Sequence, residues 1–471
     1  MHRDLVASLA AALAPVVGAE HVLVEPSARS SYETDWTARY RGRALLVVRP
    51  GSPAEVAATL RACRAHGATV VPQGGNTGLV AGATPYEQVV LATTRLDRLE
   101  PVDVRAAEVT VGAGATLEAV QVHTAPAGLA PAVDLAARGS ATIGGMVATD
   151  AGGIHVLRHG SMRDQVVGIE AVLADGRIVG HAHVLTGDAA GLDLMGVLPG
   201  SEGTLGIVTA VRLRLVPVWP HRATALVAMD GAAAAVAATA TLRERLADLD
   251  AVEYLDPAGL SLVAAHAGLQ APFGDAHAAY LLVEAAGRRP TLAGLADALV
   301  GLSGLRDAAL ADDGPGCRRL WAYRERMTEA IAAVGVAHKL DVGVPAARIG
   351  AFIDGLESLV AGVDASARVV VFGHLAVGNL HVNVLGPEPD DDRVDDAILA
   401  RVIEEGGTIG AEHGNGRAKA RWLPRAAGPA AMARAAAVKR ALDPHGLLNP
   451  GVTGRMAIDR SAGNSDIMTR N

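Results

Sequence analysis

The sequence predicts an α+β protein of more than one domain, and two observations support this prediction. The chain has 471 residues, which is too long for one ordinary hydrophobic core. Its first half places glycine-rich loops after short apolar strands, whereas the second half alternates helices such as 232–247 with strands such as 280–284. The second pattern is typical of helices packed on an antiparallel sheet. We expect the chain to divide into residues 1–217, 218–430, 431–454 and a polar, frayed tail over 455–471.

Composition and charge exclude several classes of function. Lys and Arg number 42 against 50 Asp and Glu, the net charge is −8, and no long basic run occurs, so nucleic acid is not an expected partner. Cys63 and Cys317 are too few for a disulfide framework and neither lies in a CxxC pair, which favours a reducing, cytoplasmic location. No apolar stretch is long enough to span a bilayer, so we expect no transmembrane segment.

The N-terminus, residues 1–19, allows two interpretations. Its basic start and apolar run are those of a weak signal peptide. Asp4 interrupts that run, however, and apolar residues recur at helical spacing through Leu5, Leu9, Leu13 and Val16. We therefore expect an amphipathic helix.

The first glycine-rich loop follows a helix and a strand. A capping pattern at 52–55 predicts a helix that buries Cys63 and stops at Gly67, and residues 68–72 predict a short buried strand. The sequence GGNTG at 74–78 comes next. Glycine permits positive φ and has no Cβ, so this backbone makes either a tight turn or an anion cradle. The stretch alone leaves both readings open.

Two further loops share this bare character. RGSATIGGMVATDAGG at 138–153 combines hydroxyl residues with paired glycines, and PGSEGTLG at 199–206 leads into a predicted strand over 207–216, in which apolar residues alternate with arginines. The first loop matches neither the GxxxxGK[ST] nor the GxGxxG signature. Two such loops about sixty residues apart nevertheless indicate two walls of one diphosphate site.

The loop sequences together resemble a known family. PQGGNTGLV, GSATIGG, ATDAGG, ADGRIV and PGSEGTLGIVT, in this order, resemble the two-part FAD-binding domain of the vanillyl-alcohol oxidase type of flavoprotein. Some relatives attach the flavin through a histidine in the first loop, but this chain has Asn76 there and no His or Cys nearby, so we expect noncovalent FAD. The resemblance places these residues around the cofactor: Pro72, Gln73, Gly74, Gly75, Asn76, Thr77, Gly78, Leu79, Ser140, Thr142, Gly144, Gly145, Thr149, Ala151, Gly152, Glu202, Gly206, Ile207 and Asn449.

A second set of polar residues lies in the C-terminal half. ARVVVFGHLAVGNLHVNVLG predicts two strands joined by a turn, with His374 ending the first and with His381 and Asn383 on one face of the second. GTIGAEHGNGRAKA places Glu412 and His413 in a glycine-flanked loop. Two imidazoles and a carboxylate suit a catalytic divalent metal such as zinc. Taken alone, two histidines seven residues apart in a chain with 16 histidines are more often structural.

These motifs also resemble a family. GHLxxGNLHxNV, GxxGAEHGxG and ALDPHGLLNPG are similar to the FAD-dependent D-2-hydroxy acid dehydrogenases, nearest the D-2-hydroxyglutarate dehydrogenase branch. The resemblance implies an α+β substrate domain on an antiparallel sheet, and a C-terminal segment that packs back on the FAD domain. It implies that His374, His381 and Glu412 bind the metal, that His413 is the general base, and that Asn383 contacts the substrate.

Substrate choice rests on a third stretch. RRLWAYRERMTEAIAAV at 318–334 predicts one helix with Arg324 and Thr328 stacked four residues apart, and Lys339 follows on a predicted strand. Without context, an ordinary charged helix face is the better explanation. WAYRERMTEA with a lysine eleven residues after the threonine, however, resembles the substrate pocket of the D-2-hydroxyglutarate branch. A cationic pocket of this kind would favour a second carboxylate, which D-lactate lacks.

The sequence departs from the family pattern at several positions. Ala376 and Val377 stand where the family has Gly-Asp, which would remove a polar contact near the metal. Asp150 replaces an asparagine and would bring a carboxylate close to the cofactor, and Ala81 replaces a glycine.

We expect an enzyme that oxidises a D-2-hydroxy acid, D-2-hydroxyglutarate before others, to the 2-oxo acid with noncovalent FAD and a divalent metal ion such as Zn²⁺. An electron-transfer flavoprotein or a quinone is the expected electron acceptor, and a homodimer is compatible with the sequence. The alternatives are a D-lactate or glycolate dehydrogenase, and a noncatalytic flavin-binding subunit of a larger complex.

Overall fold

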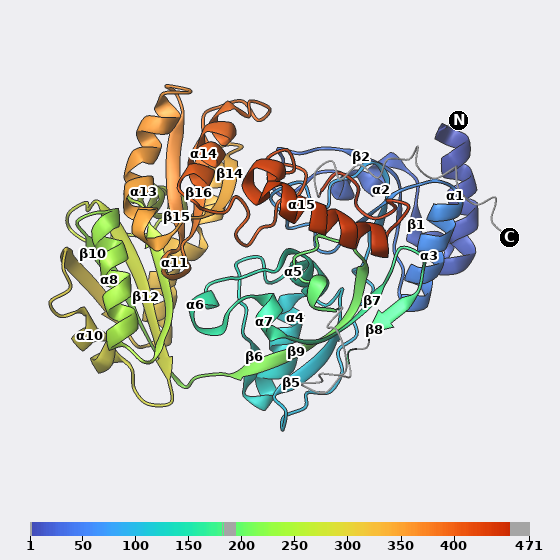
Figure 1. Cartoon of the computed structure of the whole chain (residues 1–471). Helices are drawn as coiled ribbons and strands as arrows, with labels where there is room; N and C mark the ends of the chain where they lie inside the picture. The colour runs from blue at the N-terminus through green and yellow to red at the C-terminus, as the bar shows by residue number, and fades with distance from the viewer. Residues whose placement is uncertain (1, 181, 183–194, 453–471) are drawn as a thin grey trace.

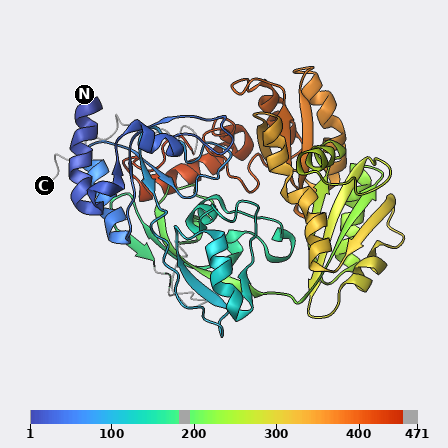
Figure 2. The same ribbon diagram turned by 180° about the vertical axis from the view of Figure 1, so that it is seen from behind.

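Three sheets organise the chain in the computed structural model, which describes residues 2–180, 182 and 195–452 (Figures 1 and 2). Two smaller sheets come from the first half, and one seven-stranded sheet comes from the second half. The predicted tail over 455–471 lies outside the described residues. None of the helices in the described ranges is long and apolar enough to cross a membrane.

The first sheet is mostly parallel and is covered by the N-terminal helices. Its strand order is β1 (Val22–Leu23), β2 (Arg43–Val48), β4 (Tyr86–Ala92) and β3 (Val70–Gln73). The predicted amphipathic helix is α1 (His2–Val17), whose Leu9 and Leu13 are fully buried in the core of this sheet. The predicted cap is also present, because Ser52 accepts a hydrogen bond from the Glu55 amide at 3.2 Å and starts α3 (Pro53–Ala65). The short helix α2 (Pro26–Arg29) precedes β2.

The second sheet is antiparallel, and the second and third glycine-rich loops adjoin its strands in the sequence. Its order is β5 (Glu108–Gly112), β9 (Ile207–Pro217), β7 (Val166–Val172) and β8 (Ile178–Gly180), and β6 (Leu129–Pro131) also pairs with β9. The predicted alternation along β9 is confirmed, since Val211, Leu213 and Leu215 are buried. Its helices are α4 (Leu117–Thr124), α5 (Ile143–Thr149), α6 (Val156–His159) and α7 (Met162–Gln165).

The third sheet is antiparallel throughout, as the sequence predicted for the second half. Its order is β13 (Leu305–Ala311), β10 (His221–Met229), β12 (Ala279–Gly287), β11 (Leu249–Leu255), β15 (Arg368–His374), β16 (Asn379–Leu385) and β14 (His338–Gly343). One face packs on α8 (Ala232–Arg245), α10 (Leu292–Leu299), α13 (Ala346–Ala361) and α14 (Arg393–Glu404). The other face packs on α9 (Pro257–Ala267), α11 (Gly314–Glu325) and α12 (Met327–Val334).

The prediction of one helix over 318–334 is wrong. Two helices, α11 and α12, meet at Arg326, whose ψ of 2° lies outside the helical range. Neither proline nor glycine marks this break, so the sequence carries no signal for it. Separate packing partners explain it, because both helices contact α9 while only α11 also contacts β10 and β13.

The C-terminal segment returns to the first sheet. Helix α15 (Leu423–Leu442) has a kink at Gly428, where φ is 75°. Beyond it, Leu447 and Leu448 are buried in the core of the first sheet. Val70 donates to the Leu447 carbonyl at 2.8 Å and accepts from the Asn449 amide at 2.7 Å. Figure 1 shows α15 lying between the labels of the first sheet and those of the large sheet.

Arg39, Arg138 and Arg158 form ion pairs that join the first half to the large sheet and its helices. The Arg39 guanidinium contacts Asp395 at 2.6 Å and Asp392 at 2.7 Å, next to the start of α14. On α6, Arg158 contacts Asp250 of β11 at 3.0 Å. Because Asp250 and Asp395 are buried, these pairs are better shielded from salt than surface pairs and fix how the two halves sit.

Candidate active site

A cavity of about 540 Å³ lies between the first half of the chain and the large sheet. Its walls contain every residue that the sequence analysis assigned to cofactor, metal, substrate or base, with the exception of Asn449. Asn449 lies behind the wall, where its side-chain amide donates to the Gly82 and Glu202 carbonyls at 2.9 and 2.8 Å. It therefore supports the cavity wall and does not line it.

The glycines of the first loop serve a different geometry from the one expected. Glycine permits positive φ, but within GGNTG only Asn76 has one, at 52°. A Cβ on Gly75 would lie 1.7 Å from the Ser140 carbonyl oxygen, so the missing side chain lets the first loop pack against the second. Gly78, in contrast, faces open space. The Asn76 side chain turns away, donating to the carbonyls of Ser31 and Thr34.

A pair of alanine substitutions separates these two roles. Gly75→Ala should lower the free energy of unfolding of the apoprotein by several kcal/mol, on the order of 3, because backbone must move to admit the Cβ. Gly78→Ala should leave the apoprotein stability within about 0.5 kcal/mol but weaken FAD binding, because its Cβ enters the open cavity. Denaturant unfolding without FAD and flavin fluorescence titration measure the two effects. Equal stability losses in both variants would contradict this account.

The Asp150 carboxylate does not lie where the family comparison suggested. It accepts hydrogen bonds from the Ser161 hydroxyl at 2.8 Å and from the Arg163 amide at 2.9 Å, and it is not among the residues that line the cavity. Its φ of 55° is tolerated because short polar side chains adopt this conformation more readily than most. Ala81, which stands for a family glycine, also has a positive φ, of 57°.

The cavity face of the large sheet follows from the two-residue period of its strands. In the antiparallel register Lys339 pairs with Asn383, and Asp341 pairs with His381 two residues along. Their neighbours Leu340 and Val382 point to the opposite face and are buried in the core. Of these two cross-strand pairs, Lys339, Asn383 and His381 line the cavity, whereas Asp341 is buried behind His381.

Three imidazoles converge on one carboxylate oxygen. The Nε2 atoms of His374, His381 and His413 lie 3.2, 3.3 and 3.5 Å from Glu412 Oε1. The other carboxylate oxygen of Glu412 accepts the Gly153 amide at 2.8 Å, which ties this cluster to the second glycine-rich loop. The structure therefore brings the predicted metal-binding and base residues together beside the predicted cofactor loop.

The charges around His374 and His381 differ strongly. Burial opposes a charge on His374, but the carboxylates of Glu253 and Glu412 outweigh it and raise its pKa to about 10. Burial dominates at His381 and lowers its pKa to about 4. Burial would raise the pKa of Glu412, yet the imidazoles, with His374 first, hold it far below its usual range. The position between these groups thus favours positive charge, which a proton or a metal ion can supply.

The donor set fits a divalent metal ion. Tetrahedral coordination with bonds of about 2.1 Å separates neighbouring ligand atoms by about 3.4 Å. The Nε2 atoms of His374 and His381 lie at such distances from Glu412 Oε1. The compact group around Glu412 is a different one, because Asp341, His381, Glu412 and His413 each offer a ligand atom within 4.8 Å of the others, and this group does not include His374. The first grouping leaves His413 free for another role, and the second does not.

Two cations line the same cavity, and one of them shares the Glu253 carboxylate with the imidazole cluster. Arg324 is buried, its Nε contacts Glu253 Oε2 at 2.6 Å, and its guanidinium lies over the Phe372 ring at 4.6 Å. Lys339 Nζ donates to Asn383 at 3.1 Å, and burial lowers its pKa to about 8. Thr328 lines the same cavity from α12, although the break at Arg326 separates it from the helix of Arg324.

The sequence analysis missed two buried acids of this site. Glu253 on β11 contacts both Arg324 and, at 2.6 Å, His374 Nδ1. Asp341 on β14 was noted as part of a strand but given no role, although it contacts His381 Nδ1 at 3.3 Å. A single glutamate in the apolar run LDAVEYL was the available signal for Glu253, because a buried charge requires a partner.

Comparisons with known proteins identify the two halves. Residues 44–180 match the family model described as "FAD binding domain", and residues 219–453 match "FAD linked oxidases, C-terminal domain". The solved structure of p-cresol methylhydroxylase superposes with a TM-score of 0.76, covering 96% of this chain and 97% of that chain at 17% identity. The class is therefore that of two-part FAD-dependent oxidoreductases with the vanillyl-alcohol oxidase type of fold.

Sequence relatives narrow the class to a family. The D-2-hydroxyglutarate dehydrogenase of Xanthomonas citri pv. viticola is 36% identical over 456 residues, which is 93% of this chain and 95% of the relative. The mitochondrial D-2-hydroxyglutarate dehydrogenase of Bos taurus is 35% identical over 440 residues, which is 91% of this chain and 80% of the relative. The chain belongs to the FAD-dependent D-2-hydroxy acid dehydrogenases, in the D-2-hydroxyglutarate dehydrogenase branch.

Proposed function

We propose that the protein oxidises D-2-hydroxyglutarate to the 2-oxo acid, with noncovalent FAD and a divalent metal ion such as Zn²⁺. One observation carries this proposal: the walls of a single cavity combine two cations with a cluster of imidazoles and carboxylates. A hydroxy acid with a second carboxylate suits this combination, because its carboxylates can meet the cations or a bound metal ion.

The protein groups divide the chemistry between them. When bound, a divalent ion would polarise the substrate hydroxyl, and FAD would accept the hydride. His374, His381 and Glu412 would hold the ion. We assign His413 as the general base. Its Nε2 would accept the proton of the substrate hydroxyl as carbon–hydrogen cleavage begins. With about a third of its side chain exposed, His413 is the most accessible of the three imidazoles.

The two cations of the cavity support the choice of a dicarboxylic substrate. Arg324 already contacts Glu253 through Nε, which leaves its terminal nitrogens for the substrate. Lys339, Asn383 and Thr328 would complete the contacts to the distal carboxylate. D-Lactate would leave these buried polar groups unpaired, and that penalty favours the longer acid.

The pKa of Lys339 predicts a pH effect that depends on the substrate. Burial lowers this pKa to about 8, so the lysine is a cation below pH 8 and loses its charge as the pH rises above it. The ratio of kcat/KM for D-2-hydroxyglutarate to kcat/KM for D-lactate should therefore fall above pH 8, by up to tenfold per unit. The Lys339→Arg variant should not show this fall, because arginine stays charged. A constant ratio from pH 7 to 10 in the parent protein would contradict the assignment.

A flavin-reduction panel tests the proposed function. The holoenzyme is mixed anaerobically with D-2-hydroxyglutarate, D-malate, D-lactate or glycolate, and loss of the flavin absorbance is followed. We expect the fastest bleaching with D-2-hydroxyglutarate. Removal of the metal with a chelator should make this bleaching much slower, and added Zn²⁺ should restore its rate. Fastest bleaching with D-lactate or glycolate would favour those activities, and no bleaching with any acid would favour a noncatalytic flavin subunit. An electron-transfer flavoprotein or quinone acceptor and a cytoplasmic location remain predictions.

A further inference from the structure

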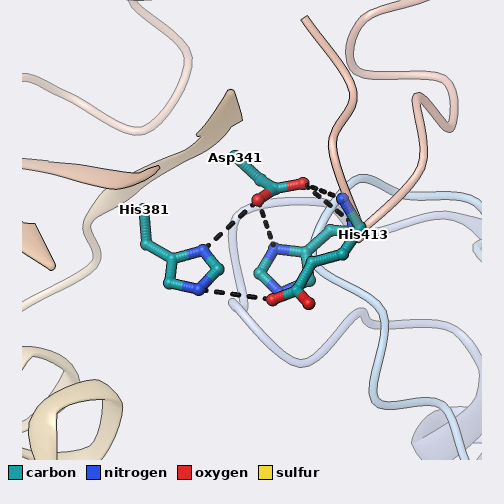
Figure 3. Close-up of side chains that lie close together, drawn as sticks. Asp341, His381 and His413 are labelled. Carbon is teal, nitrogen blue, oxygen red and sulfur yellow. Dashed lines mark hydrogen bonds and ion pairs between the residues drawn. The ribbon is translucent and has the colours of Figure 1, made fainter. Parts of the chain in front are cut away.

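We infer that Asp341 is a positioning residue that fixes both the loop of Glu412 and His413 and the ring orientation of His381 and His413. Figure 3 shows its carboxylate between the two imidazoles and the backbone of the loop. The inference rests on the proposed function for the role of His413. Asp341 itself is not required to touch the substrate, and it acts through the groups that do.

One oxygen of Asp341 holds the loop. Oδ2 accepts hydrogen bonds from three successive backbone amides, those of Ala411, Glu412 and His413, at 3.2, 2.8 and 2.9 Å. Successive amides that point at one oxygen form an anion-binding nest. Because Asp341 is 1% exposed, water cannot replace it, so this oxygen determines where the loop backbone lies.

The other oxygen faces two rings. Oδ1 lies 3.3 Å from His381 Nδ1 and 3.9 Å from His413 Nδ1, and the two rings stack with centroids 5.0 Å apart. Neither Oδ1 nor His381 Nδ1 has a hydrogen-bond partner among the residues that the structure describes, so the contact between them is electrostatic. A carboxylate beside Nδ1 favours the proton on that nitrogen, which leaves Nε2 of each ring with a lone pair. Those Nε2 atoms are the ones that approach Glu412.

A buried cation lies beside Asp341. Lys419 donates to the Asp341 and Ile409 carbonyls at 2.7 and 2.5 Å, so its ammonium is fixed next to this residue. The ammonium and the three loop amides surround Asp341 with donors, which suits a residue that anchors the loop.

His374 has its own acid in an equivalent place. Glu253 Oε1 lies 2.6 Å from His374 Nδ1, on the side of the ring opposite Glu412. Each of the three imidazoles thus has a buried carboxylate at Nδ1 and Glu412 at Nε2. Asp341 differs from Glu253 in serving two rings and the loop backbone at once.

The Asp341→Asn variant tests this role. The amide oxygen can still accept from the loop, but the NH₂ group then faces the rings and donates, which forces the proton of each ring onto Nε2. We expect a folded, yellow protein whose Zn²⁺ affinity, measured by chelator competition, falls about 10- to 100-fold. We expect kcat to fall by a similar factor, with KM changed less than about threefold.

Asp256→Asn is the matched control. Asp256 is also buried and holds two backbone amides, Gly259 at 2.6 Å and Val371 at 2.6 Å, but it contacts no imidazole and does not line the cavity. This control should lose stability while keeping Zn²⁺ affinity and kcat. If Asp341→Asn matches the control in both quantities, the inference fails.

A measurement on the parent protein keeps the inference testable if the variant does not fold. Nitrogen-15 spectra of the histidine-labelled, Zn²⁺-loaded protein, in which Glu412 binds the metal, report which ring nitrogen of His413 carries the proton, and we expect Nδ1–H. Protonation at Nε2 would overturn the inference. Failure of the proposed function is distinguishable, because a protein that bleaches with no hydroxy acid can still show the predicted tautomer and the loss of Zn²⁺ affinity.

Discussion

Replacement of His413 by alanine should lower kcat by a factor of about 10² to 10⁴, the usual contribution of a general base. The flavin should remain bound, because the first and second glycine-rich loops do not depend on this side chain. Zinc should also remain bound, since His374, His381 and Glu412 keep their geometry. Anaerobic stopped-flow of flavin reduction and metal analysis of the purified variant measure these three quantities.

His266→Ala provides a matched control. The His266 side chain is 29% exposed against 30% for His413, and it also contacts a carboxylate, that of Glu329, at 3.1 Å. This control should retain the parent rate. Loss of zinc from His413→Ala would instead assign His413 to the metal, in line with the alternative grouping with Asp341. If flavin reduction in His413→Ala is as fast as in the parent protein, His413 is not the general base.

Replacement of Lys339 by methionine should change substrate preference more than overall activity. The variant loses a charged contact to the distal carboxylate in a buried site, worth about 2–3 kcal/mol, so kcat/KM for D-2-hydroxyglutarate should fall about 100-fold. D-Lactate has no distal carboxylate, and its kcat/KM should change less than about threefold. Steady-state rates on both acids with the same preparation give an internal control. If kcat/KM falls equally for both acids, Lys339 does not bind the distal carboxylate.

Local sequence patterns predicted much of this fold because each depends on neighbours in the chain. The cap at Ser52 and the two-residue period along β9 and β16 are local signals, and the structure contains all of them. The break at Arg326 was not predictable in this way. It carries neither proline nor glycine and follows from the tertiary packing of α11 and α12.

The residues of the candidate site also divide into those that local sequence patterns predict and those that depend on tertiary structure. The polar residues on β16 and in the GAEHG loop were recognisable as motifs, and the structure brings them to one cavity. Glu253 and Asp341 were not, because their contacts join strands that are distant in sequence: β11 lies beside β15, and Glu253 pairs in register with His374. Only the strand order of the sheet reveals such partners. The reason for glycine at position 75 of the first loop likewise lies in its contact with a distant residue, Ser140.

The return of the C-terminus to the first sheet has a consequence for how the protein is made. Leu447 and Leu448 complete a core whose other members come from residues 9–207, and Asn449 supports the Glu202 loop. During synthesis, the N-terminal half therefore emerges long before the residues that complete its core. The large sheet can form in the interval, because its strands are contiguous between residues 221 and 385. We therefore expect the cofactor half to reach its native structure last, and a nascent chain lacking residues 447–449 should not retain flavin.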